Sequence, residues 1–184
     1  MFQTLSKTFG FEMPSGSPFF LDLLVIHILL GLACVVLGLA AMLATKRPRA
    51  HPRAGTLYYI CLMLLFATAS ILAAMRWTED YHLFILGALS FAAASVGPMA
   101  RRQLWPRWID FHVSGMGVSY ILMLTAFYVD NGRNLPLWRD LPYIAYWIVP
   151  GAIGIPLIVS ALARWHRRLG VGPFPVEVRQ NATS

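Results

Sequence analysis

Charged residues are scarce in this chain of 184 residues, at 12% of the sequence, whereas 58% of it is hydrophobic. Soluble domains carry roughly a quarter charged residues, so this deficit excludes an ordinary soluble globular protein. The formal net charge is +7, but basic residues in so apolar a chain are explained first by membrane topology. We therefore expect a lipid bilayer as the environment and no nucleic acid as a partner.

Cysteine is scarce as well. The two cysteines, Cys34 and Cys61, both fall in apolar segments, so they predict neither a disulfide framework nor a thiolate metal site. Gly-x-Ser-x-Gly, a glycine-rich phosphate loop and His-Glu-x-x-His are all missing from the sequence. The sequence therefore carries none of the common motifs by which hydrolases, nucleotide-binding proteins and zinc proteases are identified.

Long apolar runs are what the chain has in place of charge. Five of them are long enough to cross a bilayer as helices, which predicts an all-α, polytopic transmembrane bundle. The predicted spans lie near residues 19–44, 56–75, 81–100, 108–129 and 141–163. We expect one transmembrane domain over residues 19–163, an extracytoplasmic segment at 1–18 and a cytoplasmic tail at 164–184.

The basic residues predict an orientation. Four Lys and Arg residues fall in 45–55, three in 100–107 and four in 164–184, which is eleven of the 15 in the chain. These three segments alternate with the predicted spans and lie on one side of the membrane. Because loops rich in Lys and Arg face the cytoplasm, we expect the N-terminus outside and the C-terminus in the cytoplasm.

The predicted fourth span is unusually polar. It carries Asp110 and His112 at one end and Asp130 at the other. The residues at helical spacing from His112 are Gly115, Met116, Ser119, Met123, Ala126 and Asp130. A polar stripe inside a membrane faces protein or a cavity, so we interpret it as the inner seam of the bundle. Asp130 is its outer cap, since 18 residues place it about 27 Å from His112.

The histidines are the main candidates for chemistry. The predicted topology places His27 and His82 in the outer leaflet and His51 and His112 at the cytoplasmic side. Histidines at one depth on separate helices, with glycine nearby, are how b-type cytochromes hold haem. We therefore predict a redox protein that binds haem b, with two candidate ligand pairs, His27 with His82 and His51 with His112.

Other functions remain open on the same residues. His51, Asp110 and His112 are candidate metal ligands of a membrane enzyme. Alternatively, Asp110, His112 and Asp130 line the proton or substrate path of a small transporter or ligand-binding bundle.

A further alternative gives the histidines no ligand at all. The chain is then a homo-oligomer or a partner membrane subunit whose histidines only pack. For His82 and His166, which lie at span edges, a polar anchor or a hydrogen bond between helices is the favoured interpretation.

Two stretches of the chain resemble a family of bacterial multi-pass membrane proteins that is catalogued only as a domain of unknown function. The first holds His27-x-x-x-Gly31, Gly38, and a basic turn with His51, Gly55 and Tyr58. The second holds His112-x-x-Gly115-Met116-Gly117-x-Ser119-Tyr120, then Thr125-Ala126-Phe127-Tyr128-Val129-Asp130-Asn131-Gly132, and Leu135-Pro136-Leu137-Trp138. Pro52 departs from the family, in which Arg or another residue usually follows the histidine.

This resemblance covers most of residues 20–160 and implies a multi-pass protein of the bacterial inner membrane. It implies no activity. The histidines in bundled helices are also similar, in architecture alone, to small cytochromes of the b561 type.

Overall fold

The structure, a computed structural model, describes residues 18–44 and 49–170. Its elements are α2 (Pro18–Leu43), α3 (Ala50–Met75), α4 (Trp77–Arg102), α5 (Trp108–Asn131), the short 3₁₀ helix η1 (Gly132–Asn134) and α6 (Tyr143–Arg168). All five α-helices are long and apolar enough to cross a membrane, and the described part of the chain contains no strand. The predicted all-α transmembrane bundle is confirmed, and the chain is a multi-pass membrane protein.

Two helices extend well beyond the apolar runs that predicted them. α3 begins at Ala50, six residues before the predicted span, and takes in Pro52 within its first turn. Proline is tolerated there because the first backbone N–H groups of a helix have no partner inside the helix. α6 continues to Arg168, five residues past its predicted span. Of the two terminal segments predicted at 1–18 and 164–184, residues 1–17 and 171–184 lie outside the described residues.

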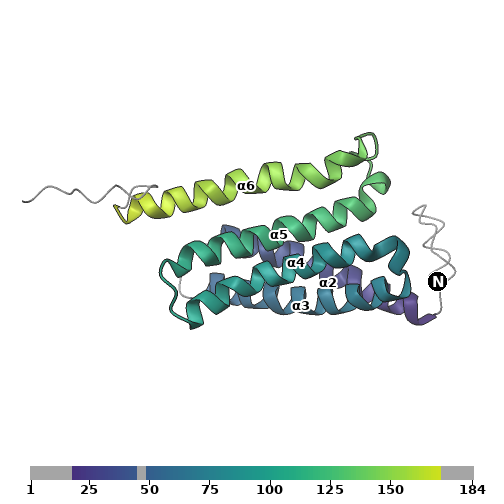
Figure 1. Ribbon diagram of the computed structural model, residues 1–184, viewed down its shortest axis with the longest axis horizontal. Helices are drawn as coiled ribbons and strands as arrows, with labels where there is room; N and C mark the ends of the chain where they lie inside the picture. The colour runs from purple at the N-terminus through teal and green to yellow at the C-terminus, as the bar shows by residue number, and fades with distance from the viewer. Residues whose placement is uncertain (1–17, 45–48, 171–184) are drawn as a thin grey trace, which may run out of the picture.

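Helices α2 to α5 form an antiparallel bundle in which each helix packs against the next along the chain (Figure 1). α6 lies on the outside of this bundle, against α5. Many of its large apolar side chains are exposed, among them Ile144, Ile148, Ile153, Ile155, Leu157 and Val159. In a membrane-spanning helix such faces contact lipid tails.

A hydrogen bond between Tyr58 of α3 and Ser119 of α5 lies at the centre of the bundle. The hydroxyl of Ser119 donates to the carbonyl oxygen of Met116 at 2.9 Å, so its oxygen accepts the hydroxyl hydrogen of Tyr58, also at 2.9 Å. Tyr58 is only 1% exposed and Ser119 is fully buried. Because lipid offers no partner for a hydroxyl group, this bond ties α3 to α5 across the bundle.

The apolar core surrounds that bond. It consists of Cys34, Tyr58, Leu62, Leu65, Ala94 and Met123, which come from all four helices of the bundle. The neighbouring Tyr120 donates its hydroxyl hydrogen to the carbonyl oxygen of Val35 at 3.0 Å and so ties α5 to α2. Among the described residues, every buried side-chain nitrogen or oxygen has a hydrogen-bond partner.

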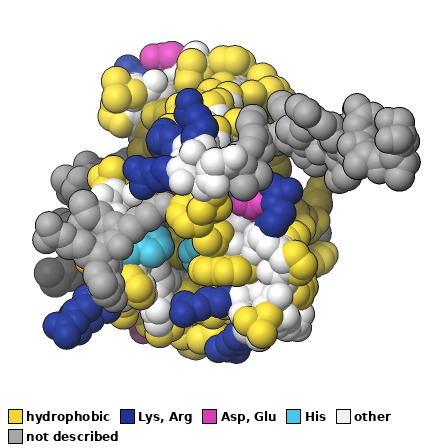
Figure 2. Space-filling view, turned by 90° about the vertical axis from the view of Figure 1, so that its left-hand side faces the viewer, with side chains coloured by type: hydrophobic (Ala, Val, Ile, Leu, Met, Phe, Trp, Pro, Cys, Tyr) yellow, Lys and Arg dark blue, Asp and Glu magenta, His cyan; other side chains and the backbone are white. Residues whose placement is uncertain are grey.

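The two ends of the molecule differ strongly in charge. We call the basic end the one at which α3 and α5 begin and α2, α4 and α6 end. Its described cations are Arg49, Arg53, Arg101, Arg102, Arg107, Arg164, Arg167 and Arg168. Asp110 is its single described acid. Figure 2 looks onto this end and shows Lys and Arg side chains spread around it with histidine side chains between them.

Gly115 permits the close approach of α4 and α5. A Cβ atom at this position would lie 2.6 Å from the carbonyl oxygen of Ala93, a backbone atom that cannot move aside. We expect Gly115→Ala to separate the two helices and to lower the free energy of unfolding by about 1–3 kcal/mol, the usual cost of overpacking. Thermal unfolding of the protein in detergent, followed by circular dichroism, measures this.

Gly151 of α6 provides the matched control. A Cβ atom there would meet nothing within 4 Å, and alanine is the better helix former. Gly151→Ala should therefore leave the unfolding temperature unchanged or slightly higher. An equal loss of stability in both variants would show that Gly115 is not required for the close approach of α4 and α5.

Candidate functional site

His51 and His112 meet at the basic end. His51 lies in the first turn of α3 and His112 in the second turn of α5, and their ring centroids are 6.1 Å apart with ring planes at 79°. Both side chains are half-buried. The structure thus brings together one of the two histidine pairs that the sequence predicted as haem ligands.

The orientation of His51 is set by the end of α2. Its Nδ1 atom lies 2.8 Å from the carbonyl oxygen of Ala41. A carbonyl oxygen only accepts hydrogen bonds, so Nδ1 carries the proton and donates it. In a neutral imidazole the lone pair is then on Nε2, the nitrogen free to bind a metal. A backbone partner that holds the other ring nitrogen is the usual companion of a metal-binding histidine.

His112 is enclosed by groups from α4 and from its own helix. A Cβ atom at Gly97 would lie 2.8 Å from its Nδ1 atom, so only glycine leaves room for the ring at this crossing. Trp108, one turn earlier, has its ring centroid 6.3 Å from that of His112. The guanidinium carbon of Arg101 lies 5.8 Å from the centroid of Trp108, a cation–π contact that holds a positive charge beside the histidine pair.

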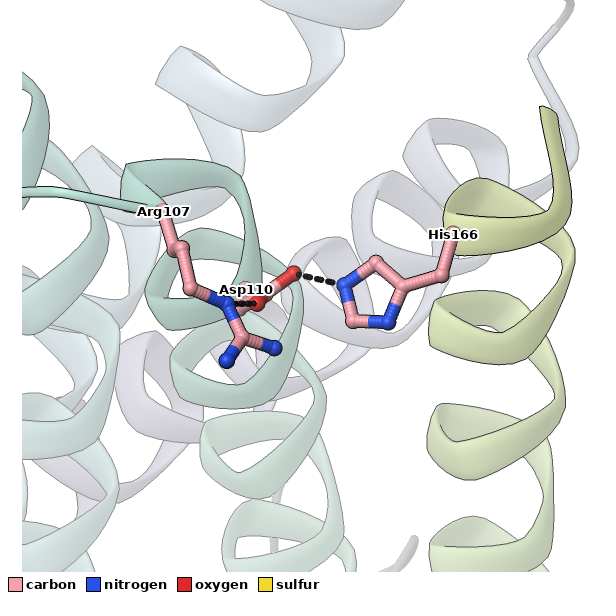
Figure 3. A network of polar contacts seen from close by, with 3 residues as sticks. All are labelled: Arg107, Asp110 and His166. Carbon is pink, nitrogen blue, oxygen red and sulfur yellow. Dashed lines mark hydrogen bonds and ion pairs between the residues drawn. The ribbon is translucent and has the colours of Figure 1, made fainter. Parts of the chain in front are cut away.

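Asp110 does not join the histidine pair. One carboxylate oxygen accepts from Nε of Arg107 at 2.7 Å, and the other lies 2.9 Å from Nε2 of His166 on α6 (Figure 3). The structure therefore places two of the three predicted metal ligands together and the third elsewhere. Within residues 18–44 and 49–170, no group of three or more His, Cys, Asp or Glu side chains is placed to hold a metal ion.

His166 links helices, as the sequence interpretation favoured. It lies 56 residues from Asp110 in the sequence, so no local pattern identified its partner. One signal was present: Asp110 is the single described acid among the arginines of the basic end, and an acid in that position needs a cation or a donor. Which of the basic residues would pair with Asp110 could not be predicted without knowing how the helices pack.

The two histidines predicted for the outer leaflet, His27 and His82, contact different helices. The Nδ1 atom of His27 lies 2.9 Å from the hydroxyl oxygen of Thr68 on α3. That hydroxyl donates to backbone carbonyl groups of its own helix, so it accepts the proton of His27. His82 instead packs against the rings of Tyr81 and of Trp147 on α6, at centroid distances of 5.7 and 6.2 Å. These contacts hold the two histidines against different neighbours, α3 for His27 and α6 for His82.

Asp130 lies at the far end of α5, exposed, with its carboxylate 3.0 Å from the side-chain nitrogen of Asn131. Twenty residues of helix separate it from Asp110, about 30 Å. Between the two acids, Ser119 and Met123 are buried in the packed core. The transport path predicted along this helix stays a prediction.

The Asp110–His166 contact should stabilise the attachment of α6. We expect a double-mutant cycle of Asp110→Ala and His166→Ala to give a coupling energy of about 1 kcal/mol, within the range for polar contacts between membrane helices. Arg139 and Asp140 form a control pair, because their charged groups are 3.7 Å apart but both side chains are largely exposed. Their coupling should be near zero, and an equal value for both pairs would contradict the attachment of α6 by Asp110.

A comparison of the chain with protein-family models, with curated proteins and with solved structures finds no significant match in any of the three.

Proposed function

We propose that this multi-pass membrane protein binds haem b between His51 and His112 and transfers electrons through it. The observation that carries the proposal is the separation of the two rings, 6.1 Å between centroids. Two imidazoles that bind one metal ion from opposite sides, with metal–nitrogen bonds of about 2 Å, have ring centroids roughly 6 Å apart. When bound, the haem iron supplies a one-electron couple between its ferrous and ferric forms.

The hydrogen bonding of His51 supports this proposal. Its Nδ1–H donates to the carbonyl oxygen of Ala41, which keeps the ring from turning away and leaves Nε2 as the atom that would bind the iron. His112 is held by packing against Gly97 and near Trp108. Both rings are therefore oriented by the protein, as the ligands of a metal site have to be.

The surroundings of the pair also fit haem. A Cβ atom at Gly55, one turn beyond His51, would meet nothing within 4 Å, so this side of α3 has open space. Seven residues beyond the histidines in each helix, the hydrogen-bonded side chains of Tyr58 and Ser119 fill the centre of the bundle, which leaves no room for the group at that depth. The group would therefore lie near the mouth of the bundle, where Arg49 and Arg53 could hold its propionate carboxylates.

The location and orientation are part of the same proposal. The resemblance to an uncharacterised bacterial family supports the inner membrane, and the eleven basic residues on one side support a cytoplasmic basic end with the N-terminus outside. In that orientation the histidine pair faces the cytoplasm, so the electron donor of the haem would come from that side.

Removal of either ligand should remove the haem. Protein purified from haem-replete cells should show a Soret band and a reducible alpha band. His51→Ala and His112→Ala should each lower the bound haem at least tenfold, because each removes one of the two residues that would hold the iron. His82→Ala is the matched control and should keep the full haem content. Absorbance per mole of protein measures all three.

Two further results make this test decisive. Added imidazole should restore part of the Soret band in the His112→Gly variant if the lost group was an iron ligand, whereas it cannot repair a folding defect. A colourless wild-type preparation from haem-replete cells would overturn the haem proposal.

The orientation has its own test. In a variant that lacks both native cysteines, Leu169→Cys reports the basic end and Arg139→Cys the opposite end. Both positions are well exposed. A membrane-impermeant maleimide added to intact cells should label Arg139→Cys at the outside and leave Leu169→Cys unlabelled until the cells are broken. The reverse labelling would show that the N-terminus is cytoplasmic.

A further inference from the structure

The loop between α4 and α5, residues 103–107, holds two non-glycine residues in left-handed backbone conformations. The φ angle is 52° at Leu104 and 60° at Arg107. Residues with a Cβ atom rarely adopt this conformation because it brings Cβ close to the following carbonyl oxygen. The side chain of Leu104 is nevertheless 85% exposed. Folding of the bundle alone therefore gives no reason for a leucine at this position.

The cations around this loop exceed the acids that could neutralise them. The guanidinium group of Arg101 lies over the face of Trp108, and Arg107 donates one of its five N–H groups to Asp110. Asp110 also accepts from His166, and it is the single acid of the basic end in the described part of the chain. Arg102 adds a further exposed positive charge. The loop therefore has guanidinium groups available for an anion from outside the protein.

Two indole rings place the loop at the membrane surface. Trp105 stacks edge-on against Phe111, with centroids 5.1 Å apart, and its Nε1 donates to the side-chain oxygen of Gln103 at 2.8 Å. Trp108 lies at the start of the membrane-spanning α5. Tryptophan is enriched where lipid headgroups meet the hydrocarbon region, so Arg107 of the loop, and Arg101 and Arg102 at the adjoining end of α4, lie at the depth of the lipid phosphates.

We infer that the α4–α5 loop is a binding site for the headgroup of an anionic phospholipid. Arg101, Arg102 and Arg107 contact the phosphate, and Leu104 inserts among the acyl chains beside it. An exposed leucine next to three cations matches a molecule that has a negative headgroup and an apolar tail. A soluble acidic protein offers the negative charge but no apolar tail. This site is independent of haem binding, since it uses none of the residues proposed to hold that group.

The experiment measures binding of phosphatidylglycerol to the purified full-length protein by native mass spectrometry in a neutral detergent, with phosphatidylcholine as the reference lipid. The wild-type protein should retain phosphatidylglycerol in preference. Each arginine near an anionic surface strengthens binding by about fivefold, so Arg101→Gln with Arg102→Gln should weaken binding by about 30-fold. Arg164→Gln with Arg168→Gln removes the same charge from the same end and should change binding by less than about threefold.

Leu104→Asn separates a binding role from a structural one. Asparagine tolerates the left-handed conformation better than leucine, so the unfolding temperature should stay the same or rise. Binding of phosphatidylglycerol should nevertheless fall by about tenfold, because the side chain no longer buries apolar surface among the acyl chains. A variant that lost both stability and lipid binding would point to a structural role and overturn the inference for Leu104.

Three other results would overturn the proposed site. Equal weakening by the two double-arginine variants would show that charge anywhere on the basic end attracts the lipid. Equal affinity for phosphatidylglycerol and phosphatidylcholine would show that the headgroup is not recognised. Displacement of the lipid by soluble polyglutamate or by inorganic phosphate at the same concentration would show that the loop binds an acidic protein or free phosphate instead.

Discussion

Polar groups inside the membrane have to find their partners within the protein, because lipid supplies none. The central bond between Tyr58 and Ser119 follows from this constraint, and so does the bond of Tyr120 to the backbone of α2. The same requirement orients the histidines: His27 donates to Thr68 and His51 to Ala41. A hydrogen bond made by Nδ1 satisfies one ring nitrogen and leaves Nε2 available as a ligand atom. One contact therefore both satisfies a buried polar group and orients the ring for binding.

Attachment of α6 depends on fewer contacts than the rest of the bundle. Its main packing partner is α5. Ile158 of α6 fits against Gly117 of α5, and Ile121 of α5 fits against Gly154 of α6. At the basic end the polar contact of Asp110 with His166 adds to this packing. Asp110 therefore has a role that its sequence position beside His112 did not indicate, since it holds two helices together while the histidine faces into the bundle.

The spans could be predicted because hydrophobic length alone decides whether a helix crosses a bilayer. Their ends were predicted less well, since α3 and α6 continue beyond the apolar runs through stretches that hold charged or polar side chains, such as Arg53 in α3 and Arg167 in α6. The pairing of His51 with His112 could be anticipated from their common depth. The pairing expected for His27 with His82 used the same reasoning, but depth does not determine which way each helix face points, and these two contact α3 and α6 instead.

Composition and the order of apolar runs by themselves determined that this is an all-α membrane protein with five spans and one strongly basic end, because burial in lipid depends on hydrophobicity and length. Only the tertiary structure decided which polar side chains meet. Rotation of each helix about its axis selects these contacts, and that rotation is set by close packing at positions such as Gly97 and Gly115. The partner of Asp110 and the strained backbone at Leu104 became visible only once the helices were in place.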